Sequence, residues 1–485
     1  MESQSREKTA KQVNVLHPQR TLLLERASLV VFILAYVKCF QWMYVDYLYP
    51  IWGYFGFDYN PPGTGYLVLA WVLSVAPSLW MPMRLTRPSQ LAYWVLYITV
   101  LIPSMFVPMY AGMNPVMEIA LLMLILFTGF AIAGSSYLLP LFHVGLLKIP
   151  KVLFWVVLAA VALFLTIWLL IVFRGHLQLV SFGAVYELRD AANDVAEGSL
   201  VNYAFMLLNG AINPFLMGYG LYFKRRWLFF AGALGQVLIY SVGGTKGSIL
   251  SIVFILGIHG LLKIRKIPFA LVLSFASLLL LAGTEFSTRF TGMGDVSFFG
   301  GILQYVILMR TLSSNGLGTA QYYDFFQRNP FTHLSHIHGV NWFVHYPYNN
   351  PVGQEIGLAY AGTADLDATA HFWATDGIGG FGLPGILLIS VICALVFWIL
   401  DSVARRHDPR LAALVTAYAA YNLANISIFT SLFSGGLALL VLLLHMTPSG
   451  SVFKLPAVSR KARRNTHSIS GRQALPGSEI SPGLS

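Results

Sequence analysis

Long apolar runs alternate with short polar turns along most of this 485-residue chain. A helix needs roughly 17–25 apolar residues to cross a bilayer, and twelve runs reach or approach that length. They fall at 27–48, 64–82, 89–109, 116–138, 152–173, 201–222, 227–243, 248–262, 267–283, 379–400, 410–428 and 434–447. The pattern predicts an all-α polytopic membrane protein with about twelve transmembrane helices. The seventh to ninth runs and the last are short, so we expect tilted, broken or partly re-entrant helices there.

Positive charge gathers in every second turn between the runs. The clusters are Arg84 and Arg87, Lys148 and Lys151, Lys224 to Arg226, Lys263 to Lys266, Arg405 to Arg410, and Arg460 to Arg464. Lys and Arg are retained in the cytoplasm, so these turns mark the cytoplasmic side. Both termini then lie in the cytoplasm, with residues 1–26 preceding a transmembrane domain at 27–447. The stretch 448–485 is rich in Ser, Pro, Gly and Arg, which predicts a disordered cytoplasmic tail.

Two loops on the opposite face, at about 174–200 and 284–378, are long enough to have their own structure. Loops longer than ~12–15 residues are usually functional or disordered. The second loop is rich in aromatic residues, which argues against disorder. These include Phe325, Phe326, Phe331, Trp342, Phe343, Tyr346, Tyr348 and Trp373. We therefore expect a large folded loop packed against the outer face of the helices.

The composition excludes a water-soluble domain and a nucleic-acid surface. The chain is 56% hydrophobic and 11% charged, and its mean hydropathy is +0.67. Soluble domains carry roughly 25% charged residues. The net charge of +11 is spread over short clusters between apolar runs, with no aromatic-interleaved basic patch for nucleic acid. The two cysteines, Cys39 and Cys393, fall inside apolar runs and predict neither a disulfide nor a metal site.

The few cations on the predicted outer face are candidates for holding an anion. They are Arg174, Arg189, Lys246, Arg289, Arg310 and Arg328. Arg174 follows the fifth run and can snorkel to the interface, and Arg328 reads as a loop-surface residue. For Arg189, Arg289 and Arg310 the alternative to anion binding is an ion pair with Glu187, Asp190, Glu285 or Asp295. Arg grips phosphate as a planar fork, whereas Lys acts as a point charge.

Three motifs that resemble known sites lack the required context. The stretch Gly243 to Ser248 lacks the spacing of a phosphate-binding loop, and Gly377 to Gly382 lacks the strand of a dinucleotide site. The latter is expected to be a flexible entry into the tenth span, although its helix amides could assist an anion. His333, His336 and His338 match no standard zinc spacing, so no metal and no cofactor are expected. A histidine there could instead contact ligand or act in catalysis.

Four short segments resemble the Wzy-type O-antigen polymerases, a family of oligosaccharide repeat-unit polymerases. Val185-Tyr186-Glu187-Leu188-Arg189 is similar to the family's Tyr-x-x-Arg segment, and Ser241 to Gly247 resembles its glycine-rich basic turn. Met309-Arg310-Thr311 with Tyr322 to Phe326 resembles its large external loop, and Phe381 to Gly385 its re-entry motif. The likeness spans about residues 180–390. It departs from the family at Lys246, where related turns often carry Arg.

The resemblance implies a GT-C-like membrane glycosyltransferase in a bacterial cytoplasmic membrane. Its substrates would be oligosaccharide repeat units linked to a polyprenyl pyrophosphate such as undecaprenyl pyrophosphate, without nucleotide sugar or catalytic metal. The growing chain would pass to a sugar hydroxyl on the next lipid-linked unit at the periplasmic face, forming O-antigen or exopolysaccharide. A chain-length regulator is a further partner that such polymerases use.

Within this hypothesis each candidate residue has a role. Arg189, Lys246, Arg289 and Arg310 would bind the pyrophosphates and offset charge on the leaving group. The base that deprotonates the acceptor hydroxyl would be His336, His338, Glu187 or Asp376, which the sequence does not rank. Trp342, Tyr346 and Trp373 would stack on sugar rings, with packing of the loop as the equal alternative.

Two other functions remain open from the sequence. An O-antigen ligase shares the topology and the large external loop, and it transfers the same donor to lipid A. A polysaccharide or lipid transporter would place ionisable residues near mid-membrane. Here only Lys38 sits centrally in a run, with Glu118 near the outer end of another.

Overall fold

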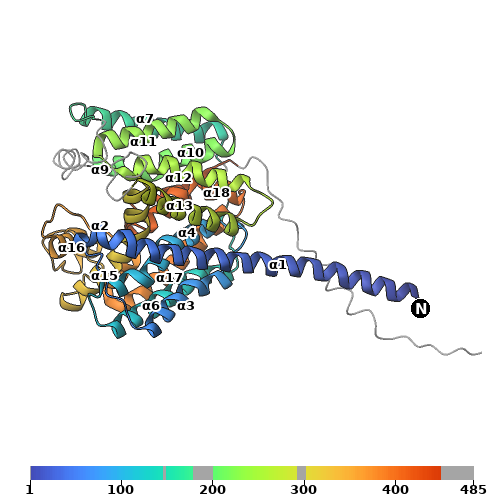
Figure 1. The fold of residues 1–485 in the computed structure, drawn as a ribbon. Helices are drawn as coiled ribbons and strands as arrows, with labels where there is room; N and C mark the ends of the chain where they lie inside the picture. The colour runs from blue at the N-terminus through green and yellow to red at the C-terminus, as the bar shows by residue number, and fades with distance from the viewer. Residues whose placement is uncertain (1, 146–148, 179–199, 292–301, 449–485) are drawn as a thin grey trace, which may run out of the picture. The chain divides into compact units, whose positions relative to one another are not determined.

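The computed structural model describes residues 2–145, 149–178, 200–291 and 302–448, and side chains within them except those of 2–20, 287–291 and 302–303. Every regular element in these ranges is helical (Figure 1). Eight segments are long and apolar enough to cross a membrane: Ser89–Ala111, Val116–Leu138, Lys151–Val172, Val201–Tyr222, Lys246–Lys263, Phe269–Phe286, Trp373–Ala404 and Ile428–Met446. The chain is a polytopic helical membrane protein.

The first half of the chain forms the helices that surround the later functional segments. Their bounds are α1 (Glu2–Met43), η1 (Tyr44–Leu48), α2 (Tyr49–Trp52), η2 (Gly53–Phe55), α3 (Thr64–Val75), η3 (Ala76–Leu79), α4 (Ser89–Leu96), η4 (Tyr97–Leu101), α5 (Ile102–Ala111), α6 (Val116–Gly134), η5 (Ser135–Leu138), α7 (Lys151–Val172), α9 (Val201–Leu207), η6 (Leu208–Ile212) and α10 (Asn213–Tyr222). Helix α1 continues the first predicted span backwards through the polar N-terminal segment.

The second half adds the remaining spans and the folded external segment. The bounds are α11 (Arg226–Gly243), α12 (Lys246–Lys263), α13 (Phe269–Thr291), η7 (Ile302–Ser313), α15 (Ser314–Arg328), η8 (Val340–Trp342), α16 (Val352–Ala361), η9 (Trp373–Ile378), α17 (Gly379–Ala404), α18 (Pro409–Val415), α19 (Ala417–Leu423), α20 (Ile428–Leu432) and α21 (Leu437–Met446). Each of the twelve predicted runs coincides with a helix or an interrupted helix.

The buried side chains form two apolar clusters. The larger joins α1, α3 to α6, α12, α13 and the segments from η7 to α17. The second joins α7, α9 to α11, α18 and α21 with the end of α17. Figure 1 shows α7, α9, α10 and α11 lying together, and α10 packs directly on α11 and α18. Burial of these apolar faces among helices is the main packing contribution of the fold.

Most interruptions of the helices lie at places other than those that the lengths of the apolar runs predicted. The seventh to ninth runs, α11 to α13, are continuous helices. The last run is the single short helix α21, and the break between Leu432 and Leu437 lies at its start, next to α20. The eleventh run is broken at Thr416. π-Helical turns interrupt the third and sixth runs, end the first and directly precede the tenth. A π turn shifts the register of a helix by one residue and is frequently found at functional sites.

The described part of the second predicted external loop, from residue 302 onward, is folded and packs between the spans. Helix α15 is buried along most of its length and packs on α5, and η7 packs on η4 and α13. The Ser104 and Thr319 hydroxyls lie 2.9 Å apart, and the Asn315 amide donates to the Thr99 carbonyl at 2.9 Å. Thr99 lies in the middle of the third predicted span. The loop therefore does more than cover the outer face, because part of it is a component of the helix bundle.

The entry to the tenth span is a tight helical hairpin. Phe381 and Gly382 have non-helical backbone angles, with φ of 66° and ψ of −147° at Gly382, a region open to glycine alone. A Cβ built on Gly385 would lie 2.1 Å from the Gly377 carbonyl oxygen, so the two arms of the hairpin touch through their backbones. The glycine-rich segment thus folds back on itself at the start of the tenth predicted span. Its glycines allow the two arms of the hairpin to pack closely.

Candidate functional site: an outer cationic patch beside an apolar cavity

Lys246 is the first residue of α12 and follows a turn of two residues. Gly244 ends α11 with φ of 59°, which lets the chain reverse, and Thr245 is the N-cap. The Thr245 side chain makes no capping bond, so no side chain of the N-cap offsets the positive end of the helix dipole. A cation at this end would be unfavourable on its own. Lys246 and the helix terminus together favour an anion.

Arg310 lies on the same face of the π-helix η7 as Tyr305, the ring that Lys246 approaches. The Lys246 Nζ atom lies 5.0 Å from the centroid of the Tyr305 ring. In a π-helix residues five apart share a face, and the Thr311 hydroxyl bond to the Val306 carbonyl, 2.6 Å, follows that spacing. Tyr305 and Arg310 are therefore on the same face of η7. Arg310 is exposed and has no ion pair with a carboxylate in the part of the chain that the structure describes.

Two tyrosines of α19 connect the cations to the neighbouring helices. Tyr418 and Tyr421 stack with ring centroids 6.0 Å apart, and Tyr421 lies within electrostatic reach of Arg310. The Asn209 amide donates to the Tyr418 hydroxyl at 3.4 Å and accepts from the Ser248 hydroxyl at 3.0 Å. Ser248 is two residues after Lys246. We call Lys246, Tyr305, Arg310, Tyr418 and Tyr421 the outer cationic patch.

An apolar cavity of about 410 Å³ adjoins this patch. It is enclosed by α12 and α13, η7, α19, and parts of α1, α4 and η4. Helix α12 begins at Lys246 and lines the cavity from Leu250 to Leu261, while η7 carries Arg310 and lines it from Val306 to Leu312. Tyr421 belongs to both features. A cationic end and an apolar interior therefore share the same three elements.

Arg310 also lines a smaller cavity, of about 70 Å³, on the loop side of η7. Its other walls come from Phe55 and Phe57, α15 and α16. The exposed guanidinium thus lies between the folded loop and the apolar cavity.

His336 and Asp376, both candidate bases, form a buried pair. The His336 Nε2 and Asp376 Oδ1 atoms lie 2.9 Å apart, and the Ile428 N–H at the start of α20 donates to Asp376 Oδ2 at 2.7 Å. The Asp376 side chain is fully buried and that of His336 is 12% exposed. Only four residues, 424–427, separate α19 from α20. The pair and the outer cationic patch are therefore attached to the two ends of one short connection.

The hydrogen bonds of His336 occupy both of its ring nitrogens. Nδ1 lies 3.3 Å from the Thr332 hydroxyl, which itself donates to the Gly379 carbonyl at 3.0 Å. Both ring nitrogens therefore have hydrogen-bond partners within the protein, Thr332 at Nδ1 and Asp376 at Nε2. The pair joins the external segment to the glycine-rich hairpin and positions both.

The other catalytic and stacking candidates differ in exposure. His338 is exposed, and the Trp342 side chain is 82% exposed, so both can meet a ligand at the surface. Tyr346 is half-buried, donates to the Asn350 carbonyl at 2.7 Å and packs on Tyr348. Trp373 is 1% exposed. Its indole N–H donates to Ser390 across the hairpin at 2.8 Å, so Trp373 packs the core and presents no ring face to a sugar.

Three predicted site residues are not placed. Arg189 and Glu187 lie outside the described residues, and Arg289 lies in α13 where side chains are not described. Arg174 is exposed just after α7. Arg328 pairs with Asp324 in the last turn of α15, where a cation complements the helix dipole. Tyr360 donates to the other oxygen of Asp324 at 2.5 Å.

Several titratable groups near the loop are held neutral. Burial lowers the pKa of His371 to about 3, and its Nε2 lies 2.8 Å from the Thr319 hydroxyl. Burial, followed by the charge of Glu355, raises the pKa of Tyr346 and brings that of Tyr348 to about 12. Among the described residues, no three of the His, Cys, Asp and Glu side chains come together as a metal site.

Sequence reasoning missed the aromatic part of the site. Tyr305, Tyr418 and Tyr421 lie in apolar segments, where aromatic residues are ordinarily packing. The apolar cavity could not be predicted from the sequence because six separate segments enclose it.

No protein-family model, curated protein or solved structure matches this chain.

Proposed function

We propose that this chain is a membrane glycosyltransferase that polymerises polyprenyl-pyrophosphate-linked oligosaccharide repeat units at the periplasmic face of a bacterial cytoplasmic membrane. The observation that supports this most directly is the shared boundary of the outer cationic patch and the apolar cavity. A lipid pyrophosphate has an anionic head and a long apolar tail. The outer cationic patch matches the anionic head, and the adjoining apolar cavity matches the tail.

The head group would be held by Lys246 and Arg310. Arg310 offers several N–H donors in a fixed plane, and Lys246 adds a point charge at a helix N-terminus. Each is supported by an aromatic neighbour, which limits the side-chain entropy lost on binding. Arg189 and Arg289 would complete the set for the second of the two substrates. The proposed role of Arg189 rests on the family resemblance, and that of Arg289 on its place among the cations of the predicted outer face.

The tail would lie in the apolar cavity. Its volume of about 410 Å³ accommodates a segment of a polyprenyl chain, and the remainder would extend into lipid. Burying isoprenoid surface contributes roughly 25 cal/mol per Å². Tail burial therefore contributes affinity, while the cations fix the pyrophosphate at the membrane surface.

The reaction is a displacement at the anomeric carbon of the donor sugar. An acceptor hydroxyl oxygen bonds to that carbon, and the bond from the carbon to the pyrophosphate oxygen breaks. The leaving polyprenyl pyrophosphate takes the bonding electron pair, and Lys246 and Arg310 stabilise the added charge. The hydroxyl proton passes to a base. His338 is the described candidate whose imidazole is exposed, whereas His336 and Asp376 act as positioning residues in our proposal.

Lys38 disfavours the transporter alternative. It is exposed on the outer surface of α1 and lies over the Trp42 ring, 5.2 Å from the centroid. Ionisable residues of transport pathways face the bundle interior or a water-filled cavity. Lys38 instead extends along an apolar surface, where a long side chain can reach the interface.

The proposal is tested by polymer length in a strain that lacks the chromosomal gene. Lys246→Ala and Arg310→Ala should each reduce long-chain polymer about 10- to 100-fold, the equivalent of one charge-assisted contact. Arg310→Lys should retain more activity than Arg310→Ala. Arg174→Ala is the matched control, because it removes an exposed cation of the predicted outer face that lies away from the patch. Normal long chains from both patch variants, at normal protein level, would refute the assignment.

The same strain distinguishes polymerase from ligase. Loss of a polymerase leaves one repeat unit on the lipopolysaccharide core, whereas loss of a ligase leaves bare core. We expect single-repeat material in the deletion strain and in the Arg310→Ala strain. Bare core would transfer the proposal to the ligase reaction, with the same donor and the same cations.

A further inference from the structure

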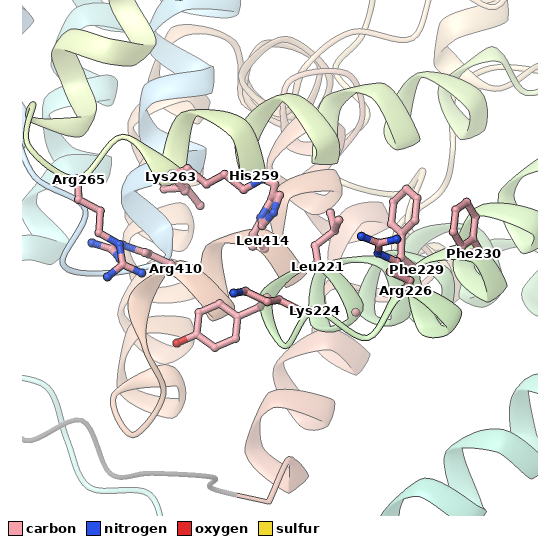
Figure 2. A pocket seen from close by; sticks show the side chains of 13 residues that line it. Leu221, Lys224, Arg226, Phe229, Phe230, His259, Lys263, Arg265, Arg410 and Leu414 are labelled. Carbon is pink, nitrogen blue, oxygen red and sulfur yellow. The ribbon is translucent and has the colours of Figure 1, made fainter.

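A third cavity lies among the basic clusters that the positive-inside bias assigns to the cytoplasm. It has a volume of about 770 Å³ and lies between the end of α10, the start of α11, the end of α12 and the start of α18 (Figure 2). It shares no lining residue with the outer cationic patch or its apolar cavity. The proposed glycosyltransferase chemistry makes no use of it.

Five cations line this inner cavity and no acidic residue does. They are Lys224, Arg226, Lys263, Arg265 and Arg410. Among the described residues none of the five forms an ion pair with a carboxylate. Arg265 and Arg410 both lie within electrostatic reach of Tyr222. Figure 2 shows them at the same end of the cavity, Arg265 from the connection that follows α12 and Arg410 from α18. Like charges gathered in this way repel one another, and an anion would relieve that repulsion.

The carboxylate of Asp408, two residues before Arg410, is already hydrogen-bonded within the protein. Asp408 is the N-cap of α18 and accepts from the Arg410 backbone N–H at 2.8 Å. Its second oxygen accepts from the Tyr222 hydroxyl at 2.9 Å. These two bonds direct the carboxylate to the helix terminus and to the tyrosine. The charge of the five side chains is therefore left for a ligand.

Apolar side chains form the remaining wall of the cavity. Leu262 and Leu414 are buried at its base, Leu221 and Phe229 are half-buried, and the Phe230 side chain is 64% exposed at its edge. Figure 2 shows Arg226 beside Phe229 and Phe230 on α11. A soluble anion would have no use for this apolar wall. A lipid would place its acyl chains there and its head group on the cations.

We propose that the inner cavity binds an anionic phospholipid of the adjacent leaflet, with its phosphate held between Arg265 and Arg410 and its acyl chains against Phe229 and Phe230. Basic cavities between transmembrane helices on the cytoplasmic side are suited to multiply charged lipid head groups. A lipid with two phosphates fits five cations better than one with a single phosphate. Such a lipid would hold α10, α11, α12 and α18 together.

The test measures lipid retention by native mass spectrometry on the full-length protein extracted in mild detergent. The probes are cardiolipin, phosphatidylcholine and inorganic pyrophosphate. We expect selective retention of cardiolipin by the wild-type protein, and roughly 30-fold weaker binding by Arg265→Gln/Arg410→Gln. Lys151→Gln/Lys266→Gln removes the same charge from the same face outside the cavity and should bind as the wild type does. Arg265→Lys/Arg410→Lys keeps the charge and should retain most binding.

Three results would overturn the proposal. The first is equal cardiolipin binding by the wild type and the Arg265→Gln/Arg410→Gln variant. The second is an equal loss in the Lys151→Gln/Lys266→Gln control, which would indicate non-specific surface electrostatics. The third is pyrophosphate binding as tight as that of cardiolipin, which would make the ligand a soluble phosphate. If the Gln variant does not fold, the Lys variant decides, because loss of binding in that folded protein would contradict a charge-based site.

Discussion

At the scale of single residues, the His336–Asp376 pair shows how a buried charge can organise an external loop. Asp376 has no exposed surface, and a carboxylate in that position requires a charged or hydrogen-bonding partner. It receives one from His336 and another from the Ile428 backbone N–H. The pair thereby connects the loop, the hairpin and α20. We infer that its contribution is to position these three elements.

Asp376→Asn tests this role. The substitution keeps the size of the side chain but leaves His336 without its charge partner, and breaking a buried pair costs about 3–5 kcal/mol. We expect a lower thermal unfolding temperature in detergent and faster proteolysis of the segment 329–351. In a double-mutant cycle with His336→Gln, the coupling energy should be at least ~1 kcal/mol. Strictly additive effects of the two substitutions would contradict the pairing.

Both members of the pair could be singled out from sequence, but their contact could not. Histidines in a polar loop and an aspartate before a span are visible as candidates. They are forty residues apart, so their contact depends on how the intervening segment folds. For Trp373 the sequence left sugar stacking and packing as equal alternatives. The structure places its ring in the core of the hairpin, which is packing.

At the scale of elements, the hairpin from Trp373 to Ser390 depends on glycine. The Gly385 Cα hydrogen faces the Gly377 carbonyl, and no side chain fits between them. Gly385→Ala should force the arms apart at a cost of about 1–3 kcal/mol or more, measured by thermal unfolding. Gly260→Ala is the matched control, because a Cβ at Gly260 in α12 meets no atom within 4 Å. Equal stability of the two variants would show that the arms are not closely packed.

The position of α13 beside the apolar cavity predicts which of its residues affect binding of the polyprenyl tail. Ala276 lines the cavity, whereas Leu279 on the same helix is 55% exposed and does not. Ala276→Trp should fill part of the space and weaken binding of a polyprenyl tail about tenfold, since a few buried methylenes contribute ~0.8 kcal/mol each. Leu279→Trp adds a ring that faces away from the cavity and should have little effect. The measurement is the binding of polyprenyl pyrophosphate to purified protein, and equal affinities would contradict the tail site.

The positions of the helices could be predicted from sequence because the length of an apolar run is a local property. The interruptions could not, since π turns and breaks depend on neighbouring helices. The segment 302–328 is another such case: its polar residues Asn315, Thr319 and Gln321 read as an external loop, yet they bond within the bundle. Polar residues enter a helix bundle when partners satisfy them, and sequence does not show the partners.

At the scale of the whole molecule, the distribution of charge assigns the two faces, and cysteine labelling can test that assignment. The native Cys39 and Cys393 are both buried, so they should not react. Trp342→Cys, on the loop, should be labelled by a membrane-impermeant maleimide in cells with a permeabilised outer membrane. Lys266→Cys, beside the inner cavity, should be labelled only after the cytoplasmic membrane is opened. The reverse pattern would invert the topology and place the outer cationic patch in the cytoplasm.

The outer cationic patch with its apolar cavity and the inner cavity are separate sites, and loss of each should have a different effect. Helix α12 borders both, with Lys246 at its first residue and Lys263 at its last. Loss of the inner site should lower stability in detergent without changing the relative effects of Lys246→Ala and Arg310→Ala. The two proposals can therefore fail independently.

The central claim is that Lys246 and Arg310 jointly hold a lipid pyrophosphate above the apolar cavity. The most direct measurement is equilibrium binding of polyprenyl pyrophosphate to the purified protein in nanodiscs. We predict that Lys246→Ala and Arg310→Ala each weaken binding roughly tenfold or more, while Arg174→Ala leaves it unchanged. If all three variants bind with the affinity of the wild-type protein, the outer cationic patch is not the pyrophosphate site.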